Sequence, residues 1–219
     1  MIALLLAELR DWREKRLTKT AILSVLVLCV PALIGPLNPL LLSIAVTAVC
    51  MVYGWTEGNR YKPSLSSRRL LLAFPRRPFE IVAGKILAGF LVWASLILIL
   101  SPVLVASSIA WGVGARETLS SLLCWLVAFM TANAAGFVSS LAFAGSEGLA
   151  GLLAYVLWGG SSLLVDALKP SNPLVQIWNI MKAQSLTATF IGLGLDLLGA
   201  LIFSVLAALV LGGGRRAHA

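Results

Sequence analysis

The sequence predicts an all-α protein that is embedded in a membrane and crosses it six times. Of its 219 residues, 59% are hydrophobic and only 12% are charged, whereas soluble domains carry about 25% charged residues. The apolar residues gather in six long runs, and the basic residues lie at the ends of those runs. This pattern is typical of a polytopic membrane protein and predicts a single membrane domain over residues 1–219.

Six apolar runs are expected to form the transmembrane helices. A spanning helix needs about 20 residues, and the first run is shorter, so we expect the preceding helix to extend it. That preceding segment, 1–19, predicts an amphipathic helix on the inner surface, because Leu5, Leu9 and Trp12 form an apolar stripe among charged residues. The expected spans are 20–34, 40–55, 86–109, 118–144, 149–165 and 186–211.

The segment 166–185 does not read as a span. It contains Pro170 and Pro173 and ends in an apolar stretch around Trp178. It is too polar to cross a bilayer and too apolar for a free loop. It therefore predicts an outer re-entrant or interfacial helix before the last span.

The distribution of charge predicts the orientation of the chain. An even number of spans places both termini on the same side. The basic residues lie on the side of the two termini, either near the termini or in the segment 57–85. The exceptions among the 17 are Arg116, Lys169 and Lys182. Because positively charged loops stay inside, both termini are expected in the cytoplasm, in a cell (plasma or inner) membrane. The net charge of +8 is therefore explained by basic residues that flank the spans on the cytoplasmic side. No nucleic-acid partner is expected.

The segment 57–85 is basic and interrupted by prolines. Ser66 or Ser67 can cap a short amphipathic helix that ends before Pro75. Pro78 suits the first turn of a following helix, and Glu80 suits the positive end of that helix. We therefore expect a short cytoplasmic helix, a proline turn and then the third span.

Within this segment, the run Leu-Leu-Leu-Ala-Phe-Pro-Arg-Arg-Pro-Phe-Glu-Ile-Val-Ala-Gly-Lys, residues 70–85, resembles the cytoplasmic coupling segment of type-2 ABC-transporter permeases. The turn Arg76-Arg77-Pro78 departs from the small or serine-containing turn of that family. The resemblance implies the permease subunit of an ATP-driven exporter that forms the translocation path as a dimer. It also implies two separate ABC ATPase subunits, which bind ATP and Mg and are coupled to the permease through residues 66–78.

The resemblance assigns ATPase coupling to eight residues: Arg68, Arg69, Leu71, Phe74, Pro75, Arg76, Arg77 and Glu80. Glu57, at the end of the second span, matches an acid found in that family. It is equally explained as a helix-end acid that pairs with Arg60 or Lys62.

The sequence contains no pattern for catalysis in this chain. The glycine-rich loop that holds nucleotide phosphates does not occur, so ATP hydrolysis is expected on a separate chain. The only histidine is His218, and Cys29, Cys50 and Cys124 are scattered within apolar runs, which predicts neither a metal site nor disulfides. The chain is therefore expected to be a transporter subunit without catalytic residues, metal or a cofactor of its own.

Two polar residues inside predicted spans are candidates for the translocation path or a subunit interface. Asp196 is the one acid well inside a span, and an ionisable group there is costly and often functional. The alternative is a structural role, in which Asp196 is hydrogen-bonded to a neighbouring helix and is either protonated or near Thr189 or Ser204. Asn133, in a stretch of small residues suited to close helix packing, is the second candidate.

Two alternative functions are compatible with the sequence. One is the haem-handling permease of cytochrome c maturation, which has a similar length and number of spans. The other is a membrane scaffold or immunity protein that does not transport and uses the basic segment for docking. A stand-alone ABC ATPase encoded next to this chain would favour transport.

Overall fold

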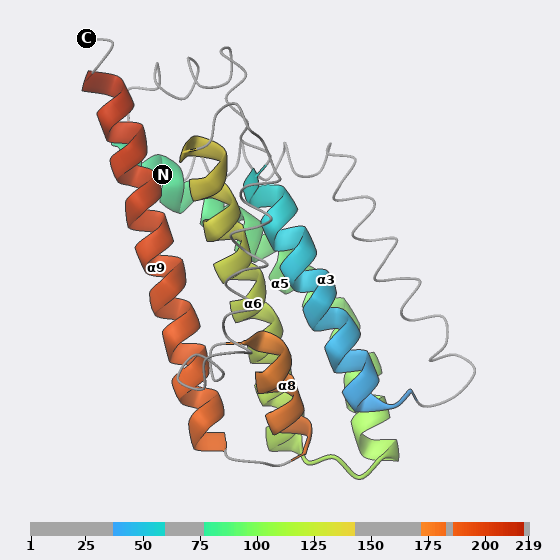
Figure 1. Cartoon of the computed structure of the whole chain (residues 1–219). Helices are drawn as coiled ribbons and strands as arrows, with labels where there is room; N and C mark the ends of the chain where they lie inside the picture. The colour runs from blue at the N-terminus through green and yellow to red at the C-terminus, as the bar shows by residue number, and fades with distance from the viewer. Residues whose placement is uncertain (1–36, 60–76, 143–171, 183–185, 217–219) are drawn as a thin grey trace.

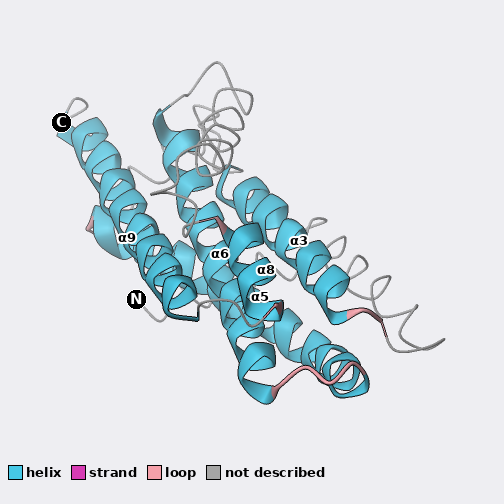
Figure 2. Cartoon of the chain, turned by 60° about the horizontal axis from the view of Figure 1, so that its bottom comes forward, coloured by secondary structure: helices cyan, strands magenta, loops and turns pink. Residues whose placement is uncertain are grey.

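A computed structural model of the chain describes residues 37–59, 77–142, 172–182 and 186–216 (Figure 1). Nearly all of these residues are helical, and no strand occurs among them, so the predicted all-α class is confirmed for this part of the chain (Figure 2). The expected helix at 1–19 and the expected spans at 20–34 and 149–165 lie outside the described residues. The described helices are α3 (Pro39–Asn59), α5 (Pro78–Ala110), α6 (Ala115–Ala142), α8 (Pro173–Met181) and α9 (Leu186–Arg216).

The four long helices, α3, α5, α6 and α9, are each long and apolar enough to cross a membrane. They fall on four of the six expected spans, and they identify the chain as a membrane-embedded protein. Their bounds differ from the expected ones. The α5 helix begins at Pro78, the residue expected in a first helical turn, but it is continuous with the third span, which was expected to start at residue 86; it buries Ile81 and Val82. The connection between α3 and α5 therefore lies within 60–77 and is shorter than the expected segment 57–85.

Two helices begin at the same local sequence, Asn-Pro. The Asn38 side chain accepts hydrogen bonds from the backbone N–H groups of Leu40 and Leu41, at 3.0 and 3.4 Å. Asn172 does the same for Leu174 and Val175, at 2.9 and 3.4 Å. The proline that follows each asparagine occupies the first turn, where its missing N–H costs nothing. These caps explain why α3 and α8 start where they do.

The turn between α5 and α6 is built by Gly112. Its φ of 68° lies in the left-handed region that favours glycine. The Val113 N–H then reaches back to the Ser108 carbonyl at 2.8 Å, and the Gly112 N–H reaches Ile109 at 3.2 Å. This pair of bonds satisfies the last carbonyls of α5 and ends the helix. It lets α6 start at Ala115 and run back beside α5.

Three of the long helices run in the same direction. Trp125 of α6 donates to the Ser43 carbonyl of α3, and Asn133 donates to Gly54 further along, so α3 and α6 are parallel. Thr131 of α6 lies against Asp196 of α9, and Leu141 packs with Leu211 at the other end of the same pair. The α9 helix is therefore parallel to α6 as well, and α5 runs the opposite way (Figure 1).

The bundle consequently has two distinct ends. At the Arg77 end lie the beginning of α5 and the last turns of α3, α6 and α9. At the Trp111 end lie the α5–α6 turn, the beginnings of α3 and α9, and α8 (Figure 1). Cys124 contacts α8, and α6 continues 18 residues further to Ala142. At 1.5 Å per residue, the end of α6 and the start of α8 are separated by roughly 27 Å along the bundle.

The α6 helix is the centre of the bundle. In its apolar stretch 67% of residues are buried, against 22% in α9. Around its middle, Trp93 of α5 stacks on Phe129 with ring centres 4.9 Å apart, and it donates its indole N–H to the Cys50 sulfur at 3.1 Å. The outer faces of α5 and α9 expose leucines and isoleucines such as Leu98 and Leu209. Those faces are suited to contact lipid acyl chains.

Candidate functional site

The structure describes four of the ten residues that the sequence assigns to ATPase coupling or to the translocation path. Arg77 and Glu80 lie at the start of α5, Asn133 in α6 and Asp196 in α9. The remaining six coupling residues lie outside the described part of the chain: Arg68, Arg69, Leu71, Phe74, Pro75 and Arg76.

The start of α5 has the local geometry that the sequence predicts. Arg77 is exposed and extended, with φ −63° and ψ 139°, and Pro78 follows in the first turn together with Glu80. A side-chain carbon placed on Gly212 of α9 would lie 3.7 Å from the Pro78 ring. The first turn of α5 therefore packs against the last turns of α9. Any segment that leads into Arg77 is joined directly to this contact.

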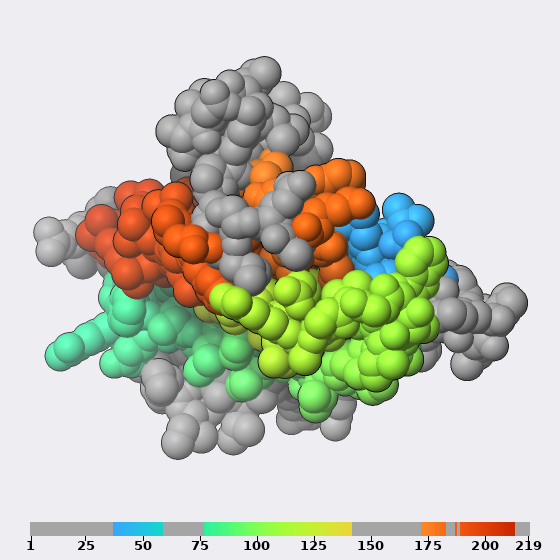
Figure 3. Space-filling model, turned by 90° about the horizontal axis from the view of Figure 1, so that it is seen from below, coloured from blue at the N-terminus to red at the C-terminus, as the bar shows by residue number. Residues whose placement is uncertain are grey.

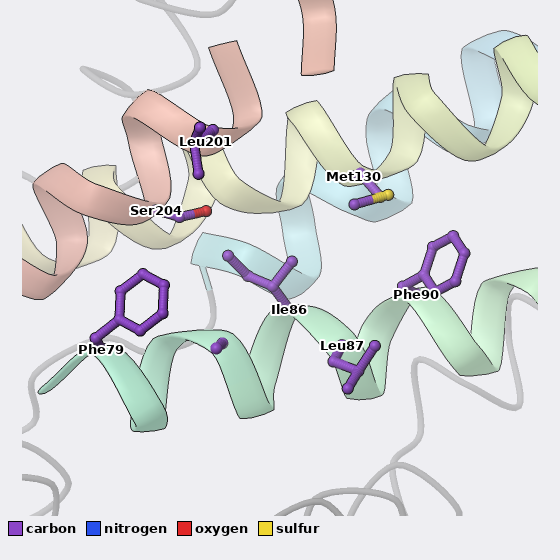
Figure 4. A pocket seen from close by; sticks show the side chains of 8 residues that line it. Phe79, Ile86, Leu87, Phe90, Met130, Leu201 and Ser204 are labelled. Carbon is purple, nitrogen blue, oxygen red and sulfur yellow. The ribbon is translucent and has the colours of Figure 1, made fainter. Parts of the chain in front are cut away.

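An apolar groove opens beside that contact, between α5, α6 and α9 (Figure 4). It has a volume of about 450 Å³, within the range of small-molecule sites. Its walls come from the first half of α5, from the middle of α6 and from α9. The eight lining residues are Phe79, Ala83, Ile86, Leu87, Phe90, Met130, Leu201 and Ser204.

Asp196 lies inside the bundle in a chain of hydrogen bonds. Its side chain is 2% exposed. Its Oδ2 accepts a hydrogen bond of 2.7 Å from Gln176 Nε2 of α8, and the Cys124 thiol of α6 donates to Gln176 Oε1 at 3.3 Å. We call these three residues the Asp196 cluster. Among the described residues, Asp196 Oδ1 has no hydrogen-bond partner. Asp196 therefore has a hydrogen bond to a neighbouring helix, through Gln176 of α8, while the Ser204 hydroxyl donates to Ala200 in its own helix. A role in the translocation path or a subunit interface stays a prediction.

The Asp196 cluster joins three helices. Seen from the Trp111 end, α8 lies between α9 and α3 (Figure 3). The Gln176 side chain of α8 lies between Cys124 of α6 and Asp196 of α9, and it is 1% exposed. Thr131 of α6 adds a contact of 3.0 Å from its hydroxyl to the Asp196 carbonyl oxygen. These hydrogen bonds link α6, α8 and α9 inside the bundle. No group of three side chains that could hold a metal ion occurs in the described segments.

Asn133 is part of a close contact between α3 and α6. It is 6% exposed, and its side chain donates to the Gly54 carbonyl at 3.3 Å. Gly54 and Gly58 form a Gly-x-x-x-Gly pattern on α3. A side-chain carbon at residue 54 would lie 2.6 Å from the Phe129 carbonyl oxygen, and one at residue 58 would lie 2.7 Å from the Phe137 nitrogen. Only glycine permits this approach, and the structure places Asn133 within it.

Sequence reasoning missed Gln176, Cys124 and the two glycines of α3. The glycines carried a usable signal, because a Gly-x-x-x-Gly spacing in an apolar helix indicates close packing. Gln176 carried a weaker one: it is a polar residue in the apolar stretch that follows Pro173. Its partner could not be found without knowing which helices surround α8.

Comparison with protein-family models, with curated proteins and with solved structures returned no match to this chain.

Proposed function

We propose that this chain is the membrane-spanning permease subunit of an ATP-driven ABC exporter. It has six spans with both termini in the cytoplasm of a plasma or inner membrane, and it forms the translocation path as a homodimer. Two separate ATPase subunits bind ATP and Mg and couple to it through residues 66–78. This chain itself catalyses no reaction.

The arrangement of the described helices supports six spans. Because α6 and α9 are parallel, the chain has to return from the Arg77 end to the Trp111 end between residues 142 and 172. The distance to be covered, roughly 27 Å, is close to the thickness of a bilayer's hydrocarbon core. The apolar run 149–165 is the natural candidate for that return, and the run 20–34 is the candidate for the first span.

The position of α8 supports a re-entrant helix before the last span. Asn172 and Gln176 are 3% and 1% exposed, and Pro173 and Ile177 are buried as well. A helix lying on the surface would leave more of these residues exposed. A helix that dips between α3, α6 and α9 satisfies its polar groups inside the protein, as a membrane requires.

One observation carries the coupling role: α5 starts at Pro78, directly after the proposed coupling segment, and runs for 33 residues to Ala110. A displacement at Arg77 is therefore transmitted along a single helix from one end of the bundle to the other. The same helix packs against α6 and α9 and forms one wall of the groove. Movement of this helix would change both that groove and the α5–α9 contact.

The coupling role predicts which side chain anchors the ATPase. Phe74→Ala should weaken co-purification of the ATPase more than Arg68→Ala, by about 2 kcal/mol or more. Buried aromatic residues dominate such contacts, whereas charges at the rim mainly guide the encounter. The measurement is ATPase recovered with affinity-purified permease, with Arg116→Ala at the opposite end of α5–α6 as the control. Equal recovery from Phe74→Ala and the unchanged protein would contradict the proposal.

A substitution in the same segment should separate binding from transport. Pro75→Ala leaves the anchoring side chains in place but allows the short helix to continue. It should retain the ATPase and its ATP hydrolysis while reducing transport into inverted vesicles. Normal transport by this variant would show that the proline turn does not transmit the movement.

A further inference from the structure

The groove between α5 and α9 is selective for an apolar occupant. Seven of its eight lining residues are hydrophobic. The exception is Ser204, whose hydroxyl donates a hydrogen bond of 2.6 Å to the Ala200 carbonyl of its own helix. That bond uses the only hydrogen the serine could donate, so the groove offers an occupant no donor.

The groove is open to the outside of the bundle along its length. Phe79, Leu87 and Leu201 line it and are 54%, 37% and 55% exposed. The view in Figure 4 shows Phe79 and Ile86 of α5 on the side of Leu201 and Ser204 of α9, and Met130 of α6 opposite Phe90. A molecule could therefore enter sideways, from the surrounding lipid.

The extent of the groove matches one leaflet of a bilayer. Its α5 wall runs from Phe79, at the Arg77 end, to Phe90. Eleven residues at 1.5 Å each cover about 16 Å, and half of a 30 Å hydrocarbon core is about 15 Å. A single acyl chain of the leaflet at the Arg77 end would therefore fit along the whole groove.

The mouth of the groove carries positive charge. Arg77 is exposed and lies two residues before Phe79, where the lining begins. The α9 helix, which contacts Pro78 through Gly212, ends in Arg215 and Arg216. In the described part of the chain, the first turn of α5 carries one acid, Glu80. The two helix ends that meet here carry Arg77, Arg215 and Arg216 in their sequence. An anionic headgroup above an apolar groove is the complementary ligand.

We propose that this groove is a binding site for one anionic phospholipid of the bilayer. One acyl chain lies between α5 and α9, and the phosphate lies at Arg77. Lipid binding at this groove requires neither the ATPase nor transport. The lipid site can therefore be tested independently of the exporter function.

The test uses the full-length protein in vesicles that contain phosphatidylglycerol or phosphatidylcholine with the same photoreactive acyl chain. Phosphatidylglycerol should give adducts on the peptides around Ala83 and Leu201, about fivefold more than phosphatidylcholine. Ala83→Phe should remove these adducts by filling the groove, and Leu201→Trp should do so from the other wall. Ala106→Phe, an exposed site at the far end of α5, should leave them unchanged.

The headgroup is tested by a matched pair of arginines. Arg77→Gln should abolish the preference for phosphatidylglycerol, whereas Arg116→Gln, also at an exposed position but at the Trp111 end, should keep it. Equal adducts from both lipids, or adducts that persist in both groove-filling variants, would overturn the proposal. So would a photoreactive residue at position 87 that links to a second copy of the chain or to residues 1–36, because protein would then occupy the groove.

Discussion

Gly58→Ala should prevent the bundle from assembling, although it adds only one methyl group. The new carbon would lie 2.7 Å from the Phe137 nitrogen and closer still to the Asn133 carbonyl oxygen. Both are backbone atoms of α6, which cannot rotate away, so α3 and α6 must separate. Separation would also break the hydrogen bond from Asn133 to Gly54. We expect a loss of about 3 kcal/mol or more, at the upper end of the cost of overpacking.

Gly194→Ala is the matched control for this prediction. It makes the same change in α9, but a side-chain carbon there would meet nothing within 4 Å. Because alanine favours helix over glycine by up to about 1 kcal/mol, this variant should be neutral or slightly more stable. The measurement is thermal unfolding of both purified variants in detergent. Similar stability of the two would show that α3 and α6 are not in close contact.

Gln176→Leu and Asp196→Leu should each destabilise the protein, and the two together should cost less than their sum. Each single change leaves a buried polar group without its partner, at a cost of about 1–3 kcal/mol. The double change removes both polar groups, so neither is left buried without the other as its hydrogen-bond partner. Interhelical hydrogen bonds in membranes reach about 1.7 kcal/mol in such cycles, and we expect a coupling energy of that order.

Asp196→Asn is the conservative control for this cycle, because its amide oxygen can still accept from Gln176 Nε2. It should assemble like the unchanged protein. If Asp196 also acts in transport, this variant should alter transport while assembly is retained. Additive effects of Gln176→Leu and Asp196→Leu on unfolding would contradict the link between α8 and α9.

The sequence predicted the four long helices that the structure describes, because their apolar runs are long and the basic residues mark their ends. It placed their bounds less well, for physical reasons that particular residues show. Lys85 looked like a charge at the end of a span, yet it is 8% exposed and lies in the third turn of α5. Likewise Gly212 looked like the start of a tail, yet it packs on Pro78 and α9 continues to Arg216.

The site was predictable only in part. Asp196 stood out because an acid in an apolar run is costly, but its partner Gln176 depends on how α8 packs, which no local pattern reveals. Glu57 was expected at the end of a span, and it is 3% exposed within α3. The groove arises from three helices that are distant in sequence, so it has no signature in any one of them.

The central claim, that residues 66–78 couple this chain to an ATPase, is tested most directly by crosslinking in intact cells. A photoreactive residue at position 74 should form an adduct with an ABC ATPase, and the yield should change when cellular ATP is depleted. The same residue at position 115, at the opposite end of the bundle, should form no such adduct. An absence of ATPase adducts at position 74, or equal adducts at positions 74 and 115, would contradict the claim.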